Sequence, residues 1–310
     1  MIPHQLSTLF KERLQWMKEH HYSDKTVQSH QESFTVFMRW CEKRSIQRCN
    51  AITADTLLAY QQGLVEQKTR QQKPFSVGYQ RNLVSTLIQC FRWAYKRGYL
   101  LINPAQHLQL PKAMKKLPVI LSVTEMQAVL NAPDLETPYG IRDRALLEVF
   151  YATGLRRNEV LKLTPADLDR KGGIVWVDQG KGKKDREVPI AHSTLEWVAH
   201  YEAEVREHWI SKGKNENQLF LNDRGKPLTK YSCNDRVLQY IRQVAPNKKG
   251  SCHLIRHSIS THLLERGCHI RFIQEILGHT SLSSTQRYAQ VRIMHLREAY
   301  KRYHPSMKKK

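Results

Sequence analysis

A proline-rich break about one third of the way along the chain most constrains how this sequence can fold. Three prolines, Pro104, Pro111 and Pro118, bracket a basic run of lysines, Lys112, Lys115 and Lys116. Proline has no backbone N–H and disfavours helix in the residue before it, so a regular element is not expected to run through this stretch. The 310 residues are therefore expected to form one domain over 1–103, a linker over 104–120 and a second domain over 121–310.

Residues 1–103 have the pattern of amphipathic helices separated by short polar turns. Ser23, Thr53 and Ser76 each precede a run in which apolar residues recur at roughly helical spacing, so each is a candidate N-cap. The last of these helices is expected to end near Gly98. We interpret the aromatic residues as core and not as exposed base-stacking platforms, because they fall on the apolar helical faces.

Residues 121–310 have a mixed pattern. Helices are predicted from Ser122 to Asn131 and from Ile141 to Ala152, and the chain beyond Ser193 is again mostly helical. Between them, β-branched and aromatic residues at 174–177 and 188–190 flank a glycine-containing turn, which predicts a small antiparallel hairpin or sheet. The expected fold class is thus mostly α with a small antiparallel β-sheet.

The charge indicates a polyanionic partner. The net charge is +22; residues 1–111 carry 15 basic and 7 acidic side chains (+8), and residues 112–310 carry 35 and 21 (+14). Because both parts are basic, we expect two lobes that grip duplex DNA, although a generally basic protein would share this composition. No apolar run has transmembrane length and the N-terminus lacks a signal-peptide layout, which favours the cytoplasm and no membrane partner. The six cysteines have no Cys-x-x-Cys pair, which favours reduced structural thiols.

Five short motifs in the second part carry candidate chemistry. They are, in chain order, Thr153-Gly154-Leu155-Arg156-Arg157-Asn158-Glu159, Gly180-Lys181-Gly182, His253-Leu254-Ile255-Arg256-His257, Leu277-Gly278-His279, and Tyr288 nine residues after His279. Arginine suits a phosphodiester, because a guanidinium is always charged and can donate two hydrogen bonds to the non-bridging oxygens. His253 and Arg256 would share a face of a helix and converge on one phosphate.

Together, in this order and spacing, the motifs resemble the catalytic domain of the tyrosine recombinase (phage integrase) family, especially its XerC-like and XerD-like members. The resemblance covers residues 112–300 by motif, and more loosely the N-terminal part, which looks like the helical, SAM-like core-binding domain of that family. It implies a mixed α/β catalytic domain. It also implies cleavage and rejoining of DNA through a covalent 3′-phosphotyrosine, with no metal and no nucleotide cofactor.

The resemblance also implies a role for each motif residue. Arg156 and Arg256 would clamp the scissile phosphate, and Glu159, an accessory residue, would hold an arginine in place. Lys181 would protonate the departing 5′ oxygen, His253 would assist proton transfer, and His279 would hydrogen-bond the phosphate. Tyr288 would be the nucleophile, its phenol activated by the surrounding positive charge.

Other interpretations of these residues remain open. Arg156 and Glu159 also fit a surface ion pair, and His253 with His257 has the spacing of a zinc pair, although no helpful third ligand is near. Lys181 lacks the spacing of a phosphate-binding P-loop, and its neighbours Lys183 and Lys184 compete for its role. The helix predicted from Ile293 to Tyr303 suits packing on its own domain as well as donation to a neighbouring protomer.

At the level of function, two rivals are a type IB topoisomerase-like relaxing enzyme and a catalytically silent DNA-binding protein on the same scaffold. The expected partner is double-stranded DNA with specific recombination sites, bound by a homo-tetramer or by a hetero-tetramer with a related recombinase. Three positions differ from the residues that are common in the family: Ile255, Ile259 and Ser260. Together with the basicity, they favour a mobile-element integrase over a resolver of chromosome dimers.

Overall fold

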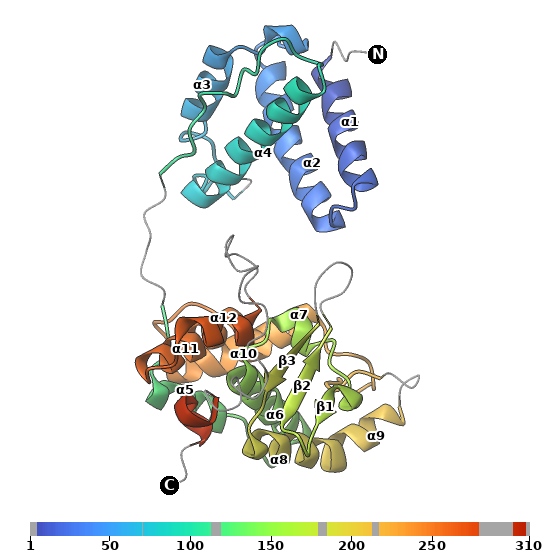
Figure 1. Cartoon of the computed structure of the whole chain (residues 1–310), viewed down its shortest axis with the longest axis vertical. Helices are drawn as coiled ribbons and strands as arrows, with labels where there is room; N and C mark the ends of the chain where they lie inside the picture. Colours follow the sequence, from blue (N-terminus) through green and yellow to red (C-terminus); the bar gives the residue numbers. More distant parts are fainter. Residues whose placement is uncertain are drawn as a thin grey trace. The chain divides into compact units, whose positions relative to one another are not determined.

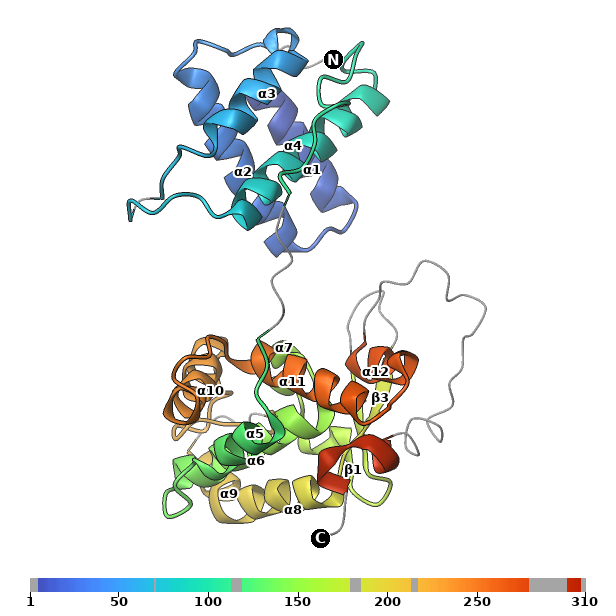
Figure 2. The same cartoon turned by 90° about the vertical axis from the view of Figure 1, so that its left-hand side faces the viewer.

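The structure, a computed structural model, describes residues 5–69, 71–112, 119–178, 185–212, 217–278 and 300–307. The chain divides into two compact units, Met1–Lys116 and Leu117–Lys310, each with its own hydrophobic core. Figures 1 and 2 show a unit made of helices alone and a unit in which helices pack beside a small sheet. The predicted fold class is confirmed.

The first unit contains four α-helices among its described residues: α1 (Leu6–Glu19), α2 (Asp24–Glu42), α3 (Ala54–Gly63) and α4 (Val77–Lys96). Aromatic rings fill the space between them. Phe10 of α1 stacks on Phe34 of α2 with ring centroids 4.3 Å apart, and Phe37 meets Tyr60 of α3 edge to face. These four rings are buried, as expected for core residues, whereas Tyr22, Tyr79 and Tyr95 of the same unit are exposed.

The three predicted N-caps are present. The side chains of Ser23, Thr53 and Ser76 each accept a hydrogen bond from the backbone N–H three residues later, and Thr53 forms a capping box with Thr56. After α4 the chain runs back along the same unit. Ala105 is buried there, and the side chain of Gln61 donates to the Gln109 carbonyl.

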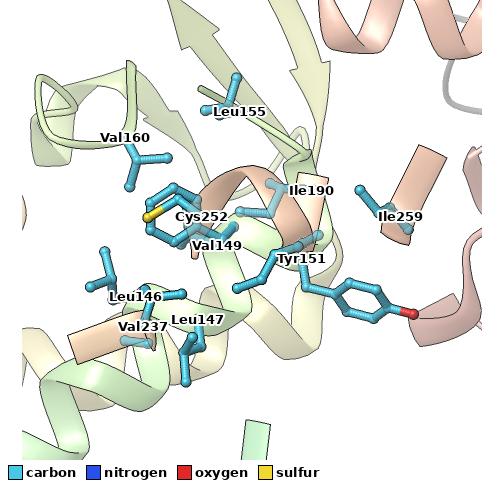
Figure 3. Packing of buried hydrophobic residues seen from close by; sticks show 14 of the residues in the cluster. Leu146, Leu147, Val149, Tyr151, Leu155, Val160, Ile190, Val237, Cys252 and Ile259 are labelled. Atoms are coloured by element: carbon cyan, nitrogen blue, oxygen red, sulfur yellow. The ribbon is translucent and has the colours of Figure 1, made fainter. Parts of the chain in front are cut away.

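The second unit is built around α6 (Pro138–Thr153), which is buried on nearly all sides. Figure 3 shows its side chains Leu146 and Val149 in one cluster with Val237 and Cys252 from other helices. The remaining α-helices among the described residues are α5 (Val123–Asn131), α7 (Arg157–Val160), α8 (His192–Tyr201), α9 (Glu207–Ile210), α10 (Lys230–Val244), α11 (Cys252–Glu265) and α12 (Ile270–Leu277).

Two differences from the sequence expectation concern α6. It starts three residues earlier than its apolar pattern, because Thr137 caps it and Pro138 occupies the first turn, where a missing N–H costs nothing. Its buried face also carries charge, since Arg142 pairs with Asp143, whose carboxylate also accepts the Tyr240 hydroxyl of α10. The side chains satisfy one another, so a helix with charged residues can lie inside the core.

The sheet has the order β1-β2-β3 and is antiparallel throughout: β1 (Leu168–Asp169), β2 (Ile174–Val177) and β3 (Arg186–Pro189). The predicted antiparallel sheet is therefore confirmed. Its first strand was missed because two residues are too short to show a period of two. The third strand begins at Arg186, two residues before the apolar run that predicted it.

Candidate active site

The first arginine of the predicted site lies where α6 ends. Gly154 has a left-handed backbone (φ +60°) that terminates the helix, and Arg156 then becomes the N-cap of α7. The Arg156 side chain is 37% exposed, so it remains available to a ligand.

Glu159 holds this turn together. One carboxylate oxygen accepts the Arg156 backbone N–H at 2.7 Å, and the other accepts the Arg156 guanidinium at 3.0 Å. Burial alone would raise the pKa of Glu159. Hydrogen bonds from Arg186 and Arg156 outweigh it, so the pKa of Glu159 lies below its usual value and the group is ionised at neutral pH.

Arg256, the second predicted arginine, and His253 lie in the first two turns of α11. Arg256 is 6% exposed, and it donates to the carbonyls of Gly154 and Leu277, both at 2.6 Å. Burial and then the charge of Arg156 lower the pKa of Arg256 to about 10, so it stays protonated at neutral pH. His253 is exposed on the same helix; its partial burial, followed by the nearby charges of His257 and Arg256, lowers the pKa of His253. Its ring is therefore largely neutral near pH 7 and able to accept a proton.

The C-terminus of α12 brings three arginines together. The carbonyls of its last residues accept hydrogen bonds from Arg186 (Ile276 O, 3.3 Å), Arg256 (Leu277 O, 2.6 Å) and Arg156 (Gly278 O, 2.7 Å). The last carbonyls of a helix have no partner within the helix and carry partial negative charge, so cations are stabilised there. Gly278 ends α12 in the left-handed conformation (φ +63°).

Of the seven residues predicted for the site, four are described, and they lie in one region. Glu159 and Arg256 both meet Arg156 or its turn, and the charges of both arginines reach His253. Lys181, His279 and Tyr288 lie outside the described residues. Lys181 belongs to the stretch between β2 and β3, and His279 directly follows Gly278.

Sequence reasoning missed Arg186. Its guanidinium makes a two-point ion pair with Glu159, at 3.1 and 2.9 Å, and its side chain is only 10% exposed. A signal was available: in a strand, residues two apart share a face, so Arg186 lies on the same side as the core residue Val188. An arginine at such a position requires a buried partner.

Two further findings concern alternatives raised by the sequence. The sulfur of Cys252 lies 3.8 Å from that of Cys233 in the core, and all six cysteines are buried free thiols. Within the described ranges, no three histidine, cysteine or acidic side chains are grouped as a metal site, and no helix has the length and apolar character to cross a membrane.

Known proteins with similar sequences point to one family. The phage integrase family matches residues 120–295 of the chain. Tyrosine recombinase XerC 2 of Ralstonia nicotianae is 38% identical over 286 residues, covering 92% of this chain and 82% of the relative. Tyrosine recombinase XerD of Staphylococcus haemolyticus is 32% identical over 301 residues, covering 97% of this chain and 99% of the relative.

Solved structures agree at the level of the fold. A lambda integrase fragment, crystallised as a dimer bound to a COC′ core site, has a TM-score of 0.69 at 17% identity, covering 93% of this chain and 99% of that chain. The XerH site-specific recombinase bound to a difH substrate has a TM-score of 0.66 at 23% identity, covering 88% of this chain and 78% of that chain. The chain therefore belongs to the phage integrase family of tyrosine recombinases and is similar to its XerC and XerD members.

Proposed function

We propose that this chain, a site-specific recombinase of that family, cuts and rejoins DNA through a covalent bond between Tyr288 and a 3′ phosphate. The observation that carries the proposal is the convergence of Arg156 and Arg256 on neighbouring carbonyls at the end of α12, directly before His279. Two guanidiniums at one point are suited to the charge that develops on a phosphodiester during displacement.

The reaction follows from the chemistry of the proposed groups. The Tyr288 oxygen attacks the scissile phosphorus, a P–O bond to tyrosine forms, and the bond to the 5′ oxygen breaks. Lys181 donates a proton to that departing oxygen, while His253 takes up the proton of the phenol. Arg156, Arg256 and His279 hold the non-bridging oxygens. Attack by a 5′ hydroxyl of another strand reverses these steps, and no nucleotide cofactor is required because the phosphotyrosine retains the bond energy.

The proposed partners are two DNA duplexes carrying specific recombination sites, joined by a tetramer of this chain or of this chain with a related recombinase. A solved lambda integrase, similar in fold with a TM-score of 0.70, was crystallised as a tetramer bound to a Holliday junction. The net charge of +22 favours binding to DNA. We also propose that the protein acts in the cytoplasm. We also propose a mobile-element role. Sequencing the DNA joined to the protein after incubation with its own genetic neighbourhood tests that role and identifies the sites.

The first prediction tests the nucleophile. A suicide DNA substrate, nicked so that the 5′ hydroxyl product diffuses away, should trap wild-type protein as a covalent adduct visible by denaturing electrophoresis. Tyr288→Phe should form no adduct, because the variant lacks only the attacking oxygen. Tyr231→Phe is the matched control, since Tyr231 is a described tyrosine that is 82% exposed on α10.

An adduct formed by Tyr288→Phe would refute the assignment of the nucleophile. A second readout separates recombination from relaxation. The wild-type protein should exchange strands between two sites on different DNA molecules. Relaxation of any supercoiled plasmid without such exchange would instead support a topoisomerase-like enzyme.

A further inference from the structure

We propose that Arg186 is a positioning residue for strand cleavage, which acts by occupying Glu159 so that Arg156 remains free to bind the scissile phosphate. The inference rests on the proposed function. It concerns a residue on β3 that no motif of the sequence analysis included, and it depends on how one carboxylate is shared between two arginines.

Arg186 takes the larger part of that carboxylate. Its two terminal nitrogens bind one oxygen each, at 3.1 and 2.9 Å, whereas the Arg156 guanidinium reaches one oxygen at 3.0 Å through a single nitrogen. This two-point arrangement is the stronger form of an arginine–carboxylate pair. Arg186 is 10% exposed and Arg156 is 37% exposed, so the buried arginine neutralises Glu159 and the exposed one keeps donors available.

Removing Arg186 would leave Arg156 as the guanidinium that neutralises Glu159. A buried carboxylate without its cation is costly, so Glu159 would draw the Arg156 guanidinium onto both of its oxygens. The same nitrogens would then be unavailable to a phosphate. Arg186 therefore acts through Arg156 and needs no contact with DNA.

Arg186 also connects the other segments of the site. Its third nitrogen donates to the Ile276 carbonyl of α12, and Gly278 packs directly on its guanidinium: a Cβ at position 278 would lie 2.9 Å from the central carbon of that group. It is the first residue of β3 and the second described residue after the stretch that contains Lys181. A lysine could not replace it, because one ammonium cannot bind both Glu159 oxygens and the carbonyl in this planar arrangement.

The test measures single-turnover cleavage of the suicide substrate at saturating protein, with DNA affinity and thermal unfolding recorded in parallel. Arg186→Gln should lower the cleavage rate about 10- to 100-fold while DNA affinity changes less than about 3-fold, since misplacing a catalytic group affects the chemical step more than binding. Arg186→Lys keeps a cation and guards against failure to fold. The cleavage rate of Arg186→Lys should also be about 10-fold or more below that of the wild type, because an ammonium cannot make the two-point pair with Glu159.

A second substitution distinguishes positioning from simple loss of stability. Adding Glu159→Gln to Arg186→Gln should restore a large part of the rate, at least about 3-fold, because the carboxylate that captures Arg156 is gone. Arg144→Gln is the matched control. Arg144, on α6, also forms a guanidinium–carboxylate pair, with Glu148, and the two side chains are 12% and 9% exposed. Its other hydrogen bonds within the described ranges go to Leu130 and Asn131. It should lower the unfolding temperature and leave the cleavage rate of the folded protein unchanged.

Three results would overturn the inference: wild-type cleavage by Arg186→Gln, a further loss on adding Glu159→Gln, or a rate loss in Arg144→Gln as large as that in Arg186→Gln. Its failure differs from failure of the proposed function. If only the inference about Arg186 fails, wild-type protein still forms the Tyr288 adduct. If the proposed function fails, wild-type protein forms no adduct, and the proposed role of Arg186 is refuted as well.

Discussion

Two glycines in the left-handed conformation end the helices that meet at the site. Gly154 closes α6 and Gly278 closes α12, and each lies against a side chain from a distant part of the chain. A residue with a Cβ in this conformation costs energy, and here it would also enter occupied space. Both glycines therefore fix where the arginines around them can lie.

Substitution of Gly154 should show both costs. A Cβ there would lie 2.8 Å from the Leu277 side chain and 3.3 Å from that of Ile259, at φ +60°. We expect Gly154→Ala to lower the free energy of unfolding by about 2–3 kcal/mol, as strain and overpacking add. Gly267→Ala is the control, with φ +82° but ordinary contact at 3.6 Å to Tyr303, and should lose only about 1 kcal/mol. Urea unfolding of both variants checks this, and equal losses would contradict the steric argument.

At the scale of elements, local signals account for most helix boundaries. Caps at Ser23, Thr53 and Ser76 were predicted from single residues, and Ser122 forms a capping box with Glu125 at the start of α5. Such signals are readable because a cap involves residues only three apart. The C-terminal segment is different. Of the helix predicted from Ile293 to Tyr303, the part before residue 300 lies outside the described residues, and residues 300–303 are helical and pack within the second unit.

This segment is held by His304, which is fully buried. One ring nitrogen of His304 lies 3.3 Å from the Tyr151 carbonyl, and the other accepts the Ser306 backbone N–H at 3.1 Å. The second contact requires an unprotonated nitrogen, so the ring is neutral and donates to the carbonyl. Burial lowers the pKa of His304 to about 3, and the nearby Arg266 and His262 act in the same direction.

The pH dependence of stability follows. The unfolded chain binds a proton at His304 near its ordinary pKa of ~6.5, whereas the folded chain does not until about pH 3. The contribution of neutral His304 to the free energy of unfolding is therefore complete above about pH 6.5 and is lost as the pH falls toward 3. The loss between pH ~7.5 and ~5 is about 2 kcal/mol. His304→Gln should have a lower free energy of unfolding than the wild type at both pH values. Between pH ~7.5 and ~5, however, the free energy of unfolding of the variant should fall by about 2 kcal/mol less than that of the wild type. Urea titrations at the two pH values measure this; an unchanged pH slope in the variant would contradict it.

At the scale of the whole molecule, positive charge is spread over both units. Residues 1–116 carry 18 basic and 7 acidic side chains (+11), and residues 117–310 carry 32 and 21 (+11). A duplex bound by both units would release many counterions, so affinity should depend steeply on salt. DNA bound by only one basic tail of the protein would release few counterions.

We expect DNA affinity to fall about 1,000-fold or more between about 50 and 200 mM salt, as for a protein with at least six phosphate contacts. Fluorescence anisotropy with a labelled duplex, repeated across the salt series, gives the slope. A slope corresponding to only one or two phosphates would contradict binding by both units.

The sequence by itself determined most of the helices, two of the three strands and the family to which the chain belongs. Helix caps, apolar periodicity and helix-ending glycines involve neighbours in the chain, and the order of five motifs identified the family. Only the tertiary structure showed that Arg186 belongs with them and that α12 ends among three guanidiniums. Arg156 and the Gly278 carbonyl that it binds are 122 residues apart. No local pattern records such a contact, because it depends on how α6, α11, α12 and β3 pack around one core.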